Sequence, residues 1–311
     1  MKLPAIFLFL AAMITRAQVG APQLGYVADG TRLRPVYGIP AAAAVLAPLD
    51  YGHNFARMAI SPRQDFAIAS DADSGEVLLV SAASAATIPG TLLNPDRISI
   101  SPRGSAAALW FSSAGRLQII SGLPGSPSVR DVTTAFLNET PGAIAVSDDG
   151  AMAAGSLPDG LYSFGPNGEV NRIPMRERVG ALAFYGASHD LALATRLQIW
   201  KVANASPGAM SSLYRADLLA PVGIALSSDN QRLTLAQSSG RILTLDLSSG
   251  AASQTDCGCS PEGVFPVGPS VFRITAFDGA TFRVFDPSSG NFFFVPLAPV
   301  QQNDAQQGGA Q

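Results

Sequence analysis

Residues 97–104 read RISISPRG, an alternation of apolar and polar residues that ends in a Ser-Pro-Arg-Gly turn. A period of two is that of a β-strand, and serine, proline and glycine favour a tight turn. Five other segments have the same form and start 38 to 46 residues apart: RMAISPRQ from Arg57, AIAVSDDG from Ala143, ALAFYGAS from Ala181, GIALSSDN from Gly223 and GVFPVGPS from Gly263. A second apolar stretch follows each segment, so each unit is predicted to contain a β-hairpin.

A third strand-like element follows each hairpin, as in EVLLVS from Glu76, and one more copy, RLRPVYG from Arg32, precedes all six units. Its seven equivalent positions are about 41.5 residues apart on average: Leu33, Val77, Leu117, Leu161, Leu197, Ile242 and Phe282. A weaker fourth strand follows, often after a turn such as LDLSSG ending at Gly250. Four short strands in about 40 residues are typical of a β-propeller blade.

The sequence therefore predicts an all-β chain that folds as a β-propeller of four-stranded blades. Residues 23–48 supply three strands of a first blade but no recognisable innermost strand. We favour seven blades, with the first one incomplete or closed by pairing of the two ends. Six blades with an N-terminal extension is the alternative.

The Ser-Pro turn of residues 98–104 and the Asp-x-Ser-Ser-Gly hairpins resemble those of YVTN-type and WD-repeat-like β-propellers over about residues 24–298. The resemblance is architectural. No Trp-Asp dipeptide ends a strand, the YVTN string is absent, and the turn at Tyr185 is degenerate. The resemblance implies the fold and leaves the subfamily open.

The two ends of the chain have a different composition from the repeats. Residues 1–17 contain Lys2, an apolar run from Leu3 to Ile14 and small residues before Gln18, as in a secretory signal peptide cleaved after Ala17. Residues 18–300 are predicted to form a single domain, and 301–311 (QQNDAQQGGAQ) a disordered polar tail. We expect an exported protein, periplasmic or extracellular, with no transmembrane span in the mature chain.

Composition narrows the classes of partner and chemistry. Hydrophobic residues make up 47% of the chain and charged residues 14%, and the net charge of −3 offers no basic field for nucleic acid. His53 and His189 are the only histidines, and no nucleophile elbow, P-loop or dinucleotide fingerprint occurs. We therefore expect no catalytic residues, no cofactor and no metal site. We also expect a monomer that binds a protein or small-molecule ligand.

Cys257 and Cys259 are the only cysteines. In an extended strand their Cα atoms would lie about 6.6 Å apart, and Gly258 lets the chain tighten enough for a disulfide. An exported protein favours that disulfide. A redox-active pair, a metal site and a free dithiol are the alternatives.

Propellers commonly bind ligands where the loops around the central channel meet. Arg57 and Arg97 occupy equivalent repeat positions at this mouth, and the further candidates are Arg178, Glu262, Asp71 and Asp278. Arginines there would accept a carboxylate or an acidic peptide, and the alternative is inter-blade ion pairing and solvated charge.

The sequence therefore predicts a non-enzymatic scaffold that binds a protein or small ligand at its loop face. A hydrolase or lactonase-like enzyme with carboxylates at the channel mouth is the alternative, and a structural subunit of a cell-envelope assembly is a third.

Overall fold

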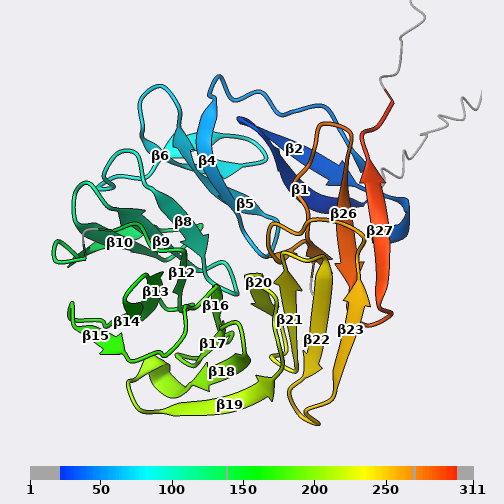
Figure 1. Cartoon of the computed structure of the whole chain (residues 1–311). Coiled ribbons are helices and arrows are strands. Elements are labelled where there is room, and N and C mark those ends of the chain that lie inside the picture. Colours follow the sequence, from blue (N-terminus) through cyan, green and yellow to red (C-terminus); the bar gives the residue numbers. More distant parts are fainter. Residues whose placement is uncertain (1–21, 138, 269–270, 300–311) are drawn as a thin grey trace, which may run out of the picture.

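A computed structural model describes residues 22–137, 139–268 and 271–299. The predicted signal peptide, 1–17, and the predicted polar tail, 301–311, lie outside these residues. Seven antiparallel sheets surround a central axis, as Figure 1 shows, with the first blade (blue) beside the last (red). The predicted seven-bladed propeller is confirmed, and the six-bladed alternative is wrong. No helix in the described ranges is long and apolar enough to cross a membrane.

Six sheets have four strands and the first has three. Blade 1 consists of β1 (Gln23–Asp29), β2 (Arg32–Tyr37) and β3 (Ala44–Val45). Blades 2 and 3 are β4 (Phe55–Ile60), β5 (Phe66–Asp71), β6 (Val77–Ser81), β7 (Ala85–Thr87), and β8 (Arg97–Ile100), β9 (Ala106–Phe111), β10 (Arg116–Ser121), β11 (Ser128–Thr133). Blades 4 and 5 are β12 (Ala143–Val146), β13 (Ala153–Leu157), β14 (Gly160–Phe164), β15 (Val170–Ile173), and β16 (Ala181–Phe184), β17 (Leu191–Ala194), β18 (Gln198–Val202), β19 (Met210–Arg215). Blades 6 and 7 are β20 (Pro221–Leu226), β21 (Arg232–Gln237), β22 (Arg241–Asp246), β23 (Ala252–Asp256), and β24 (Phe265–Pro266), β25 (Phe272–Arg273), β26 (Thr281–Asp286), β27 (Asn291–Pro296). Two single-turn 3-10 helices, η1 (Pro40–Ala42) and η2 (Ala203–Ala205), lie in loops.

The middle strands of each blade are buried on both faces because neighbouring blades pack against them. Every residue of β5 and of β9 is buried. Side chains from adjacent blades interlock between the sheets, as where Trp110 of blade 3 meets Phe164 of blade 4 with ring centroids 5.8 Å apart. The small and apolar residues that alternate along these strands fit this two-sided burial.

The two faces of the propeller carry different connections. We call the face with the turns between second and third strands, and with the links to the next blade, the link side. The opposite face carries the turns between first and second strands, and we call it the turn side. On the link side, the Asn94 N–H donates to the Gly75 carbonyl, which joins the link before blade 3 to the β5–β6 turn.

The turn between β1 and β2 shows which positions of blade 1 the three described strands occupy. The Phe55 N–H, at the start of blade 2, donates to the Thr31 carbonyl in this turn. The β1–β2 turn therefore lies on the link side, like the turn between second and third strands in blade 2. It follows that β1, β2 and β3 are the second, third and fourth strands of blade 1. No described strand takes the innermost position.

Two sets of contacts close the ring between blade 7 and blade 1, one direct and one through Gln64 of the β4–β5 turn in blade 2. At the periphery, the Ala298 N–H donates to the Val45 carbonyl, and Leu297 forms an isolated parallel bridge with Val45. Near the axis, the side-chain amide of Gln64 accepts from the Tyr26 N–H at 2.8 Å and donates to the Pro266 carbonyl at 2.5 Å. Segments from both ends of the described chain thus lie side by side (Figure 1).

On the turn side, polar side chains join one blade to the next. Asp148 of blade 4 accepts from the backbone N–H groups of Arg103 in blade 3 and Ala187 in blade 5, each at 2.7 Å. Asn230 of blade 6 accepts from the Gly186 N–H at 2.8 Å. These bonds connect four consecutive blades.

Candidate binding site at the channel mouth

The central channel is a cavity of about 380 Å³. The innermost strands of blades 2 to 7 line it, mostly with small or apolar side chains. In blade 1, where no described strand takes the innermost position, β1 adds Tyr26 and Ala28. The charged residues in the lining are Arg97, Glu262 and Arg273. The channel is thus a largely apolar space with few charged groups to orient a ligand.

The three predicted arginines lie at the link-side ends of innermost strands. Arg57 belongs to β4, Arg97 begins β8, and Arg178 precedes β16, and all three side chains are exposed. The Arg178 guanidinium reaches the start of blade 4, because its Nη2 would lie 3.7 Å from a Cβ atom built on Gly142. None of the three forms an ion pair with another described residue. Among the described residues, these arginines therefore do not join one blade to another through ion pairs.

The predicted carboxylates do not gather at the mouth. Asp71 is buried, and its Oδ1 accepts from the N–H groups of Asp73 and Ser74 while Oδ2 lies 2.6 Å from Nδ1 of His53. The bonds from Ser74 and His53 lower the pKa of Asp71 to about 2. This carboxylate therefore stays ionised and holds the β5–β6 turn.

Asp278 has a similar structural role in blade 7. Its Oδ1 accepts from the N–H groups of Ala280 and Thr281, and these bonds lower the pKa of Asp278. An acid held ionised in this way is poorly suited to donate a proton in catalysis. Of the three predicted acids, Glu262 alone lines the channel.

Sequence reasoning missed Arg273, which lies in β25 and reaches the channel. Its Nη1 donates to the Thr275 carbonyl at 2.6 Å, and its Cζ lies 4.2 Å from the centre of the Phe265 ring. Burial lowers the pKa of Arg273 to about 10, and the charge of Glu262 opposes this shift. The sequence feature that could have identified Arg273 is a charged residue in the middle of a second strand, VFRITAF. The second strands of blades 2 and 3 are DFAIAS and SAAALWF.

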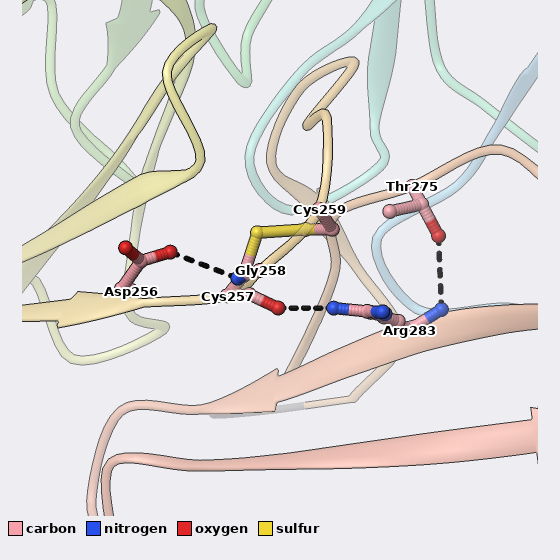
Figure 2. Close-up of a disulfide and its surroundings, with 6 residues drawn as sticks. All are labelled: Asp256, Cys257, Gly258, Cys259, Thr275 and Arg283. Atoms are coloured by element: carbon pink, nitrogen blue, oxygen red, sulfur yellow. Dashed lines mark hydrogen bonds between the residues drawn. A yellow bond between two sulfur atoms is a disulfide. The ribbon is translucent and has the colours of Figure 1, made fainter.

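Cys257 and Cys259 are joined by a disulfide in the link between blades 6 and 7 (Figure 2). Their Cα atoms lie 5.1 Å apart, closer than in an extended strand, because Gly258 between them adopts a φ of 53°. The Asp256 carboxylate accepts from the Gly258 N–H, and Arg283 of blade 7 donates to the Cys257 carbonyl. The disulfide thus shapes a link-side loop that is attached to the next blade.

A second hollow lies on the turn side, around Arg103, Asp148, Asp149 and His189. Its acidic groups and His189 already have hydrogen-bond partners within the protein. Nε2 of His189 lies 2.7 Å from Oδ2 of Asp149, and Asp148 accepts backbone N–H groups from the neighbouring turns. In residues 22–137, 139–268 and 271–299, no three histidine, cysteine or acidic residues are grouped so as to hold a metal ion.

No family model matches the chain, and no curated protein matches it in sequence. Its structure is similar to that of apo AztD from Citrobacter koseri (13% identity, 90% of this chain and 96% of that one, TM-score 0.58). It is also similar to a streptogramin B lyase (12%, 78% and 82%, 0.58) and to a functionally unknown protein from Desulfotomaculum acetoxidans (13%, 90% and 100%, 0.59). At these identities the likeness shows the fold alone. The chain is a seven-bladed β-propeller.

Proposed function

We propose that the protein is an exported scaffold that binds a protein or small ligand through an acidic group at the link-side mouth of its channel. The observation that supports this is the set of three exposed arginines, Arg57, Arg97 and Arg178, at the ends of innermost strands. A guanidinium offers a planar pair of donors that matches a carboxylate, and a rigid propeller holds such groups at fixed spacing. Export is supported by the N-terminal sequence.

The geometry favours binding over catalysis. A channel-mouth hydrolase needs carboxylates that are free to exchange protons or hold a metal ion, whereas Asp71 and Asp278 are both engaged by turn N–H groups. Glu262 is the one carboxylate among the described residues that lines the channel, so the mouth lacks the group of acids that the hydrolase alternative requires.

The arginines can be tested with a labelled hexaglutamate peptide as the acidic probe. Replacing Arg57, Arg97 and Arg178 by Ala should weaken its binding, measured by fluorescence anisotropy, by about tenfold or more, because charge-assisted bonds to carboxylates are lost. The matched control replaces Arg63, Arg172 and Arg232, which lie away from the mouth, and should change affinity by less than about twofold, since the net charge changes equally. Equal losses in both triple variants, or no loss in either, would show that the mouth arginines are not a binding site.

A further inference from the structure

The inner edge of β1 is unusual for a propeller because it faces the channel and no strand of the described residues pairs with it. Tyr26 stands opposite Pro35 of β2, and its N–H points away from β2 and donates to Oε1 of Gln64. Since backbone groups alternate in direction along a strand, the N–H and C=O of Ala28 point to the same inner edge. Among the described strands, β2 is the one paired with β1. An edge of this kind can accept another strand.

Gln64 spans the position that no described strand occupies, with a single amide group. Its Oε1 accepts from Tyr26 of blade 1, and its Nε2 donates to Pro266 of blade 7. A peptide group in an added strand has the same acceptor and donor, so an incoming carbonyl can replace Oε1 of Gln64 at the Tyr26 N–H. Such an exchange keeps the Tyr26 donor satisfied.

Blade 7 directs a positive charge toward this position. Arg273 is paired with Val284 across the sheet, so the two side chains share a face. Val284 packs in one cluster with Val27 and Val36 of blade 1, which shows that this face looks toward blade 1. Arg273 is partly buried, and no carboxylate of the described residues lies within ion-pair distance of its guanidinium. The charge of Glu262 acts on Arg273 from beyond ion-pair distance, and a partly buried cation without a direct ion pair still favours an acidic ligand.

We propose that the innermost position of blade 1 takes an extended acidic segment of a partner protein, which adds as a strand to β1 and places a carboxylate against Arg273. Strand addition supplies affinity through backbone bonds to Tyr26 and Ala28, and Arg273 supplies selectivity for an acid. The site goes beyond the proposed function, because it does not use Arg57, Arg97 or Arg178.

The probe for this site is a labelled peptide with the β8 sequence, Arg97–Ser101, in which Asp stands at the place of Ile98. The β8 strand is the innermost strand of blade 3, and its Ile98 packs against blade 2. The corresponding side chain in blade 1 would therefore face blade 7 and Arg273. Two control peptides carry Asn in place of the Asp, or N-methyl groups on all backbone amides.

The Asp peptide should bind the full chain about tenfold more tightly than either control peptide, because each control lacks one of the two interactions. Arg273→Met should remove the preference for Asp over Asn, whereas Arg273→Lys should keep it, which separates lost charge from misfolding. The triple variant at Arg57, Arg97 and Arg178 should bind the Asp peptide as the original chain does. This arm distinguishes failure of the channel-mouth site from failure of the strand site.

Two results would overturn the proposal. One is equal binding, or no binding at millimolar concentration, of the Asp, Asn and N-methylated peptides. The other is slow hydrogen exchange of the Ala28 amide in the free protein, because it would mean that the chain's own residues or a second copy already occupy the edge.

Discussion

Trp110→Ala should lower the free energy of unfolding by about 3–5 kcal/mol, since it opens a large cavity in a packed interior. Trp110 is fully buried in β9 and fills the space between blades 3 and 4, where it packs edge-on against Phe164. A propeller closes as a ring, so a gap between two blades also weakens the contacts of the blades on either side. Urea unfolding followed by far-ultraviolet circular dichroism measures the loss without relying on tryptophan fluorescence.

Trp110→Phe is the matched control for this prediction. Nε1 of Trp110 is buried without a hydrogen-bond partner among the described residues, so Phe keeps most apolar contacts and removes an unsatisfied donor. The loss for Trp110→Phe should stay below about 1.5 kcal/mol. If Trp110→Ala costs no more than Trp110→Phe, the tight packing between blades 3 and 4 described above is wrong.

Asp148→Ala should be the second most damaging change, with a loss of about 2–4 kcal/mol. Its carboxylate accepts N–H groups from two other blades. Hydrogen bonds to a charged acceptor contribute about 1.5–3 kcal/mol, and two bonds to one carboxylate contribute less than twice that amount because they are not additive. The side chain is 11% exposed, so water replaces these bonds poorly. The loss would be measured by the same urea unfolding experiment.

The control for Asp148 is Asp217→Ala. Asp217 is 57% exposed and forms a surface ion pair with Arg196 at 3.6 Å, and such pairs contribute little. Its loss should be within about 0.5 kcal/mol. Similar losses for the two substitutions would show that the turn-side bonds between blades do not stabilise the ring.

The fold could be predicted because the same sequence pattern recurs from blade to blade. Each blade buries its middle strands on both faces, which requires the same alternation of apolar residues about every 40 positions. RLRPVYG from Arg32 has the pattern of a third strand, and the structure places it there as β2, with β1 before it. How the ends meet was harder to predict, because the bridge from Leu297 to Val45 and the Gln64 contacts are single bonds between distant residues.

The candidate site could be predicted only in part. Arg57 and Arg97 have equivalent repeat positions, and both lie in innermost strands, as the third residue of β4 and the first of β8. Asp71 was grouped with the channel-mouth acids, although Asp71–Gly75 has the same Asp-x-x-Ser-Gly spacing as the turns that begin at Asp246 and Asp286. In all three turns the aspartate Oδ1 accepts a backbone N–H from within the turn. That spacing was a signal for a turn-holding aspartate.

The most direct test is an experimental structure of the purified full chain, judged by the electron density beside β1. The seven-bladed ring with an open innermost position in blade 1 predicts that no strand of the same chain pairs with Tyr26 and Ala28. Gln64 should still join Tyr26 to Pro266, as it does here. A strand of the chain hydrogen-bonded to the inner edge of β1 would contradict this account of blade 1 and remove its strand-binding site.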